Sequence, residues 1–292
     1  MQHLMDSINI IDVRVSLGDS GFLIDDGKTA ILYDSGFAFT GYAMADKIKE
    51  YLGDRKLDYI FLTHSHYDHA LGSAYVLKYW PDAKVVAGEY AVKIFAKDSA
   101  KALMRDLDRK FADYNNLGEY EDLIDNLRVD IPVGDGDEIT AGDMVFTAVN
   151  LPGHTRCSIG FYLKEKKLLL ACETLGVFDG ENRVVPSFLV GYQMSIDSIR
   201  KAQALDIENV VVPHCGYLDK EQTAFYLEEA NKSTVNVAEE IATLLRVGGT
   251  KEEALNMFKD KFYHGKVREM YPVDAMELNT NIMIGVIEKE LL

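Results

Sequence analysis

The stretch Thr63-His64-Ser65-His66-Tyr67-Asp68-His69 is the strongest indication of fold and function in this chain of 292 residues. It follows the apolar run Tyr59-Ile60-Phe61-Leu62, which predicts a buried strand, and it precedes residues 70–80, whose apolar spacing predicts a helix. The histidines therefore lie in a loop at the carboxyl end of a strand, which is where open α/β sheets place their functional sites.

The side chains of this loop are of the kinds that bind transition metals. Neutral imidazole and carboxylate groups are ordinary ligands of zinc, iron and manganese. His64 and His66 can both turn toward one point, whereas Asp68 and His69 point from the start of the helix toward a second. The spacing therefore predicts metal binding, and a surface loop that happens to be rich in histidine is the alternative interpretation.

The pattern His-x-His-x-Asp-His after an apolar strand resembles the signature of the metallo-β-lactamase-fold superfamily. This resemblance implies an α/β fold, a four-layer αβ/βα sandwich. It also implies two divalent metal ions, the first bound by His64 and His66 and the second by Asp68 and His69.

Two later histidines extend the resemblance. The passage that runs from Gly134-Asp-Gly-Asp-Glu-Ile to Leu151-Pro-Gly-His-Thr resembles the glyoxalase II-like branch of the superfamily. From this likeness His154 is expected as the third ligand of the first metal. His214 follows the apolar run Asn209-Val-Val-Val-Pro, and the resemblance implies that it is the third ligand of the second metal.

Glu173 is the main departure from the family pattern. It follows paired strands predicted over 158–163 and 167–172, at the place where the family normally has an aspartate that bridges both metals. A glutamate is one methylene longer, so it either still bridges the two metals or binds only one of them. We call residues 63–69, which carry the first four candidate ligands, the metal loop. Asp34, at the end of an earlier strand, matches the family aspartate that steadies this loop, although a plain turn aspartate is the alternative.

The chain is expected to form a catalytic domain over residues 1–217 and a C-terminal helical extension over residues 218–292. Strands are predicted over 8–17 and 21–34. The pairs Asp219 with Gln222 and Thr250 with Glu253 predict capping boxes that open two of the C-terminal helices.

Residues 89–125 form a charge-rich insertion with one apolar helical face. The insertion is either a lid that shapes the substrate pocket or a helix that packs on the core or in a dimer contact. By analogy with the family, the C-terminal helices either bind the non-reacting part of the substrate or mediate dimerisation, so a homodimer is compatible with the sequence.

Composition narrows the class of partner. A formal net charge of −16 argues against nucleic acid, because nucleic-acid binders need a basic face. The sequence shows neither a signal peptide nor an apolar run of the roughly 20 residues that a membrane span requires. Three cysteines without a Cys-x-x-Cys pair fit a reducing compartment, and we expect a soluble, cytoplasmic protein without a membrane partner.

The resemblance implies a hydrolase that uses a metal-bridging hydroxide, with Asp68 both as a ligand and as the residue that orients the hydroxide. Zinc is the expected metal, and iron or manganese are the alternatives. A small-molecule thioester or other ester is the expected substrate, with lactones and phosphodiesters as alternatives. Because of the departure at Glu173, a second interpretation is a non-hydrolytic di-iron protein that binds or reduces oxygen. A metal-binding regulator is a third interpretation.

Substrate contacts are expected from the loop of residues 175–192, in which Phe178, Phe188 and Tyr192 are candidates. The cationic side chains that would meet a carboxylate-bearing carrier of the acyl-glutathione type are sought in the C-terminal extension, at Lys232, Lys261, Lys266 and Arg268.

Overall fold

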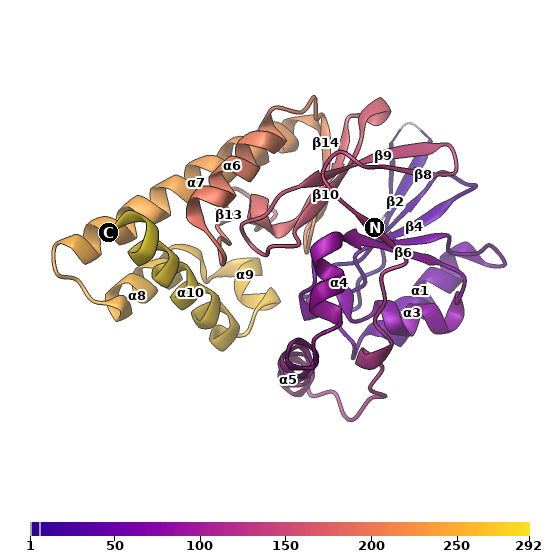
Figure 1. The fold of residues 1–292 in the computed structure, drawn as a ribbon, viewed down its shortest axis with the longest axis horizontal. Coiled ribbons are helices and arrows are strands. Elements are labelled where there is room, and N and C mark those ends of the chain that lie inside the picture. Colours follow the sequence, from indigo (N-terminus) through magenta and orange to yellow (C-terminus); the bar gives the residue numbers. More distant parts are fainter. Residues whose placement is uncertain (1, 6) are drawn as a thin grey trace.

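The computed structural model describes residues 2–5 and 7–292, and its elements form four layers in the order helix, sheet, sheet, helix (Figure 1). The larger sheet has seven strands that lie side by side in chain order. Strands β1 to β4 pair antiparallel and β4 to β7 pair parallel, so the carboxyl ends of β4, β5 and β6 lie at one edge. The seven strands are β1 (Gln2–Met5), β2 (Ile8–Asp12), β3 (Phe22–Asp25), β4 (Ala30–Tyr33), β5 (Tyr59–Leu62), β6 (Lys84–Gly88) and β7 (Ile131–Val133).

The smaller sheet has six strands and is antiparallel except where β11 and β14 pair in parallel. A separate two-stranded ribbon, β12 with β13, follows β11 in the chain. In spatial order the six strands are β15 (Gly216–Leu218), β14 (Asn209–Val212), β11 (Leu168–Leu170), β10 (Ile159–Leu163), β9 (Met144–Asn150) and β8 (Glu138–Ala141). The ribbon strands are β12 (Val177–Phe178) and β13 (Val184–Val185).

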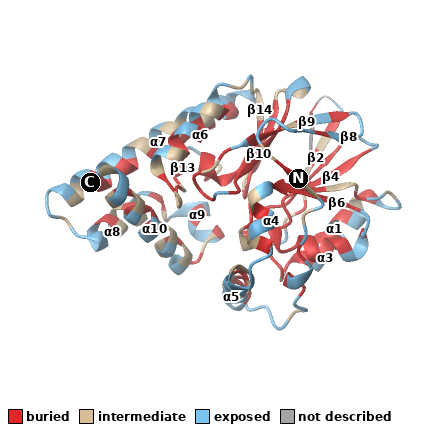
Figure 2. Cartoon of the chain, viewed as in Figure 1, coloured by how far each residue is buried: buried red, intermediate tan, exposed pale blue. Residues whose placement is uncertain are grey.

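Many residues of both sheets are buried (Figure 2), and an apolar core fills the space between the sheets. Phe61 of the larger sheet lies at its centre, with ring centroids 4.6 Å from Phe161 and 5.3 Å from Phe146 of the smaller sheet. All three side chains are fully buried. Because each of these aromatic side chains removes a large apolar area from water, their mutual packing fixes one sheet on the other.

Helices cover the outer face of each sheet. Ile48 of α1 and Tyr75 of α3 pack on the larger sheet, whereas Ile199 of α6 and Tyr226 of α7 pack on the smaller one. This arrangement confirms the predicted four-layer α/β sandwich. The helices of these two layers and of the metal loop are α1 (Gly41–Leu52), α2 (Tyr67–Ala70), α3 (Ser73–Tyr79), α6 (Tyr192–Gln203) and α7 (Lys220–Arg246).

The C-terminal helices share an apolar cluster of their own, in which Ile241 of α7, Phe258 of α8 and Ile284 of α10 are buried. The predicted capping boxes at the starts of α7 and α8 are confirmed. The division of the chain at residue 217 stays a prediction. No helix within residues 2–5 and 7–292 is long and apolar enough to cross a membrane. The helices that follow α7 are α8 (Lys251–Phe262), α9 (Gly265–Met270) and α10 (Val273–Leu291).

The first predicted strand is shorter than its sequence pattern indicates. Strand β2 ends at Asp12, although the pattern predicts a strand to residue 17. The carboxylate of the buried Asp19 accepts hydrogen bonds from the backbone N–H groups of Val15 at 2.9 Å and Ser16 at 2.7 Å. A side chain that binds nearby backbone groups competes with strand pairing, so the chain turns here.

The insertion folds as two helices, α4 (Glu89–Phe95) and α5 (Asp98–Tyr114). Helix α5 packs on the core through Phe111, whose ring centroid lies 4.9 Å from that of Phe37. The fully buried Asp108 adds a polar contact, because it accepts hydrogen bonds from the backbone N–H of Ala38 at 2.8 Å and from the hydroxyl of Tyr120.

We expect Asp108 to make the protein less stable as the pH rises. Burial raises the pKa of Asp108 from 3.8 to about 7, so the folded chain retains a proton that the unfolded chain releases. The resulting stabilisation is complete below pH 3.8 and is lost as the pH rises through about 7. Its size is at most about 4 kcal/mol, since one pKa unit corresponds to about 1.4 kcal/mol.

Urea unfolding at pH 5 and pH 8 measures this effect. Asp108→Asn should lose much of the fall in stability between the two pH values, whereas the control Asp106→Asn, at an exposed position on the same helix, should keep it. Equal pH dependence in the wild-type protein and Asp108→Asn would contradict the assignment.

Candidate metal centre

Seven side chains of kinds that bind metals come from four segments and meet at the edge where the strands of both sheets end. The segment from the end of β5 into α2 supplies four of them, and the others follow β9, β11 and β14. Six of the seven side chains are buried, and His66 is half-buried. These residues are His64, His66, Asp68, His69, His154, Glu173 and His214.

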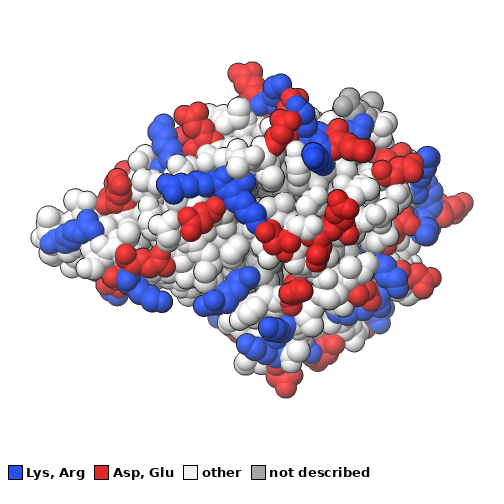
Figure 3. Space-filling view, turned by 45° about the horizontal axis from the view of Figure 1, so that its top comes forward, with Lys and Arg blue, Asp and Glu red and all other residues white. Residues whose placement is uncertain are grey.

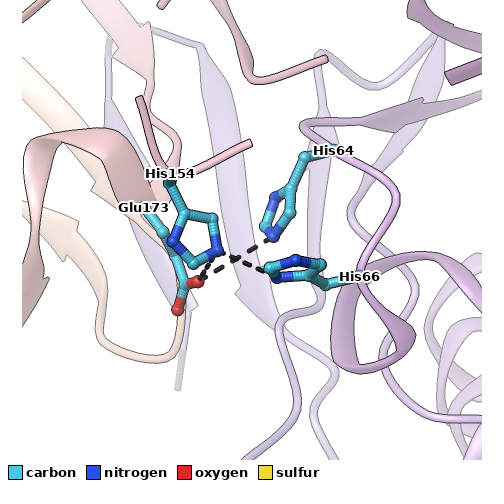
Figure 4. Close-up of side chains that lie close together, drawn as sticks. All are labelled: His64, His66, His154 and Glu173. Carbon is cyan, nitrogen blue, oxygen red and sulfur yellow. Dashed lines mark hydrogen bonds and ion pairs between the residues drawn. The ribbon is translucent and has the colours of Figure 1, made fainter. Parts of the chain in front are cut away.

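The first group brings together His64, His66, His154 and Glu173, whose candidate ligand atoms all lie within 4.8 Å of one another. Figure 4 shows the three imidazoles and the carboxylate converging from opposite sides. His154 Nε2 lies 2.7 Å from Glu173 Oε2 and 2.9 Å from His66 Nδ1. His64 Nε2 lies 3.8 Å from the same Glu173 oxygen.

The second group consists of Asp68, His69, His214 and, again, Glu173. Its candidate ligand atoms also all lie within 4.8 Å of one another. His214 Nε2 lies 2.9 Å from Glu173 Oε1 and 3.1 Å from His69 Nε2. Asp68 Oδ2 lies 3.7 Å from His69 Nε2. Glu173 therefore directs one carboxylate oxygen to each group, which is the arrangement expected of a shared ligand.

Hydrogen bonds on the outer side of the rings fix how the imidazoles are protonated. His69 Nδ1–H donates to Asp34 Oδ2 at 2.7 Å, and His154 Nδ1–H donates to the carbonyl of Ser187 at 3.0 Å. His214 Nδ1–H donates to the carbonyl of Asp19 at 3.1 Å. When a ring with such an outer contact is neutral, its unprotonated Nε2 faces the centre, and outer contacts of this kind are typical of metal-binding histidines.

The inward-facing nitrogens fit divalent cations. Within the described part of the chain, the buried His64 Nε2 has no hydrogen-bond partner. The approaches between His154 and His66, at 2.9 Å, and between His69 and His214, at 3.1 Å, each bring two ring nitrogens together. Two neutral lone pairs at such distances repel each other unless a proton or a cation lies between them. The donor set of imidazoles and carboxylates suits zinc, iron or manganese.

Electrostatics favour neutral rings at His64 and His66 but a protonated ring at His69. Burial would lower the pKa of His69, but the Asp34 and Asp68 carboxylates raise that pKa well above the usual range, so a cation at the centre would have to displace the Nε2 proton of this ring. Burial, reinforced by the neighbouring imidazoles, lowers the pKa of His64 and His66 well below the usual range, so both rings are neutral and able to donate a lone pair.

Burial alone would raise the pKa of Glu173. The contacts with His154 first and then His214 instead lower that pKa well below its usual value. This effect requires positive charge between the rings and the carboxylate, which either a proton on a ring or a bound cation supplies.

Asp34 lies at the end of β4 and connects two parts of the site. It is fully buried, and it accepts hydrogen bonds from His69 Nδ1 at 2.7 Å and from the backbone N–H of Thr63 at 2.8 Å. Ser20 donates to it as well, at 2.9 Å. Asp34 itself has a φ of 54°, in the left-handed region, which turns the chain sharply after the strand. These contacts hold the start of the metal loop against β4.

A cavity of about 770 Å³ opens from the two groups toward the surface. His66, Asp68, His154 and Glu173 form its floor, helix α5 forms one wall, and α10 forms another. The ribbon of β12 and β13 contributes Val177 and Val185. The insertion and the C-terminal helices therefore both border the candidate site.

Phe178, Phe188 and Tyr192, the candidates from the sequence for substrate contact, lie outside the lining of this cavity. Phe178 is buried against Tyr226, with ring centroids 6.0 Å apart, and it borders a second, smaller cavity. The ring of Tyr192 packs edge-on against Phe188 at 5.6 Å. Their part in substrate binding stays a prediction.

Tyr271, between α9 and α10, is a residue of the site that the sequence pattern does not single out. Its hydroxyl donates a hydrogen bond to Glu173 Oε1 at 3.2 Å, and its ring centroid lies 5.6 Å from that of His214. The C-terminal extension thus reaches the centre directly. The Tyr271-Pro272 pair, which ends one helix and starts the next, is a local signal in the sequence for a turn at this point, but it does not indicate the contact with Glu173.

Comparison with known proteins agrees with this geometry. Residues 18–214 match the family model of the metallo-beta-lactamase superfamily. A hydroxyacylglutathione hydrolase of Brucella anthropi is 26% identical over 191 residues, which cover 64% of this chain but only 59% of that protein. Hydroxyacylglutathione hydrolase 1 of Vibrio vulnificus is 24% identical over 236 residues, which cover 80% of this chain and 76% of that protein.

Among solved structures, a metallo-beta-lactamase family protein from Thermus thermophilus superposes with a TM-score of 0.62. It is 17% identical, and the match covers 97% of this chain and 89% of that one. At this identity the likeness concerns the fold. The family match covers more than half of the chain and includes all seven clustered side chains. The chain is therefore a member of the metallo-beta-lactamase superfamily.

Proposed function

We propose that this protein is a dinuclear metal-dependent hydrolase that acts on a thioester or another ester. The observation that carries the proposal is the placement of Glu173, which directs Oε2 to His154 at 2.7 Å and Oε1 to His214 at 2.9 Å. The first ion would be held by His64, His66 and His154, and the second by Asp68, His69 and His214, with Glu173 shared between them.

Two divalent ions in such a site supply a water that is deprotonated near neutral pH and polarise the substrate carbonyl. The chain supplies the rest of the chemistry. Asp68 places a buried carboxylate at the cavity floor, where its oxygen accepts a hydrogen bond from the attacking water and orients it. Tyr271 holds the Glu173 carboxylate from the C-terminal side. The apolar cavity walls keep bulk water away from the reacting bond.

Zinc is the metal that we propose first, with iron or manganese as alternatives for the same donor set. The partner is a small molecule. On the face shown in Figure 3, basic side chains are interspersed with acidic ones, and the net charge is −16, so nucleic acid is not proposed as a partner. A cytoplasmic location and a homodimer remain predictions from the sequence.

Metal analysis tests the proposal. Protein purified without added metal should contain about two ions of zinc or manganese per chain, show no visible absorption band, and hydrolyse members of a thioester, ester and lactone panel. Removal of the metal with a chelator should abolish turnover. A pair of irons with an oxygen-sensitive absorption band, together with no hydrolysis, would instead identify an oxygen-binding or redox protein.

Substitution of Glu173 tests whether it is shared. Glu173→Ala should reduce the content to less than one ion per chain, because both groups lose a carboxylate oxygen. Glu173→Asp restores the carboxylate and should retain both ions. Glu138→Ala, an exposed glutamate on β8, is the control. Retention of two ions by Glu173→Ala would show that this residue does not bridge.

A further inference from the structure

The two helical walls of the large cavity face it with apolar stripes. Leu103 and Leu107 lie one helical turn apart on α5, and Leu278 and Ile282 lie one turn apart on α10, so each pair occupies a single face of its helix. Three of these side chains remain well exposed: Leu103 by 59%, Leu278 by 48% and Ile282 by 40%. Exposed apolar side chains gathered around one opening indicate a ligand-binding surface.

Charged groups are sparse in the same cavity. Apart from the candidate metal ligands, the charged side chains that line it are Lys110, Asp113 and Asp274. Lys110 is the one cation among the described lining residues, and its amino group is 2.8 Å from the Asp106 carboxylate on the same helix. Away from the candidate metal ligands, a substrate with several negative charges would therefore meet more acidic than basic groups.

The basic side chains of the C-terminal extension do not supply positive charge to this cavity. Lys261 pairs with Glu240 at 2.8 Å, and Lys232 lies 3.6 Å from Glu229. Lys266 borders the smaller cavity of about 150 Å³, and Arg268 lines neither cavity. The cationic contacts that the sequence suggested for an acyl-glutathione carrier thus lie away from the cavity that contains the candidate metal ligands.

We propose that the substrate is an uncharged ester or thioester whose apolar chain lies between α5 and α10. This proposal rests on the proposed hydrolase function. A volume of about 770 Å³ is within the range of pockets that enclose small organic ligands. In the reaction, the oxygen of one water bonds to the carbonyl carbon and the bond from that carbon to the ester oxygen or thioester sulfur breaks. A carboxylic acid is released together with an alcohol or a thiol that takes up a proton.

Two series of esters of increasing chain length measure the preference for an apolar chain. In metal-replete protein, kcat/KM is determined for methyl esters of acids from two to ten carbons and for acetates of alcohols of the same lengths. We expect at least one series to rise by about fourfold per methylene until the cavity is filled, because each buried methylene contributes a constant transfer free energy. Acyl-glutathione of equal chain length should be a poorer substrate than the uncharged ester. Flat series, or a preference for the glutathione ester, would overturn the proposal.

Charged substitutions on the α10 wall link the preference to this cavity. Ile282→Asp should reduce the ratio of long-chain to two-carbon kcat/KM by about tenfold or more, because a carboxylate in the apolar wall opposes chain burial. Leu278→Asp is the second variant and is expected to act in the same direction. Val247→Asp is the matched control, since Val247 is 79% exposed and lies outside the cavity lining. Unchanged ratios in both α10 variants would overturn the assignment.

A binding measurement separates this proposal from the proposed function. Calorimetric titration with 2-butanone and 2-decanone, which cannot be hydrolysed, should show tighter binding of the longer ketone and weaker binding to Ile282→Asp. Length-dependent binding without hydrolysis of any ester would support the apolar site and refute the hydrolase. Hydrolysis without length dependence in either binding or kcat/KM would support the hydrolase and refute the apolar site.

Discussion

Asp68→Ala will reduce kcat/KM for ester hydrolysis by about 1,000-fold or more in a chain that remains folded. Asp68 is buried at the cavity floor, and its Oδ2 lies 3.7 Å from His69 Nε2 and 3.8 Å from His214 Nε2. The substitution removes the carboxylate that we propose both as a ligand in the second group and as the acceptor that orients the attacking water. His66→Ala should have a comparable effect through the first group.

Turnover and metal content measured on the same samples distinguish the two roles proposed for Asp68. Loss of activity together with loss of one ion would indicate that binding dominates, whereas loss of activity with two ions retained would indicate orientation of water. The control is Asp260→Ala, at an exposed position of α8. Unchanged activity in both Asp68→Ala and His66→Ala would refute the proposed site.

Gly72→Ala will destabilise the protein by several kcal/mol or prevent its folding. A Cβ atom at this position would lie 1.8 Å from the carbonyl oxygen of Ser35 and 2.9 Å from its carbonyl carbon. Both are backbone atoms, so no side-chain rotation relieves the clash. The Gly72 N–H also donates to the Gly36 carbonyl at 3.1 Å, and Ser35 N–H donates to the His69 carbonyl at 2.7 Å. The substitution would therefore force apart the segments that carry Asp34 and the metal loop.

Thermal unfolding of metal-free and metal-replete protein measures the effect of Gly72→Ala, with Gly285→Ala as the matched control. Gly285 lies within α10, and a Cβ there would meet no atom within 4 Å. Alanine favours the helix, so the control should gain about 0.5 to 1 kcal/mol of stability. If Gly72→Ala unfolds within about 2 °C of the wild-type protein, the close approach is not required for folding.

Four of the candidate metal ligands can be predicted from the sequence because they lie close together in one loop. His64, His66, Asp68 and His69 occupy six positions, and the strand that precedes them has a pattern that neighbouring residues alone reveal. The capping box at Asp219 is equally local and is present in the structure. The four-layer fold follows from such segments once the family resemblance supplies their arrangement.

The contacts that depend on long-range packing are not visible in the sequence. Tyr271 contacts Glu173 across a separation of 98 residues, and no periodicity in either segment specifies that contact. Similarly, the apolar residues of α5 and α10 each fit a helix packed on the core, and only their shared cavity shows that part of each stripe remains open. The early end of β2 has the same cause, because the Asp19 carboxylate overrides the local strand preference.

The two cavity walls differ in their relation to the family. Helix α5 lies within residues 18–214, which match the superfamily model, whereas α10 begins at Val273 and lies beyond that match. None of the seven clustered side chains belongs to α10. If the proposed apolar site is correct, mutation in this helix would change substrate preference while leaving the seven clustered side chains in place. Exchange of α10 between homologues would test in the laboratory whether this wall can be varied independently of the seven clustered side chains.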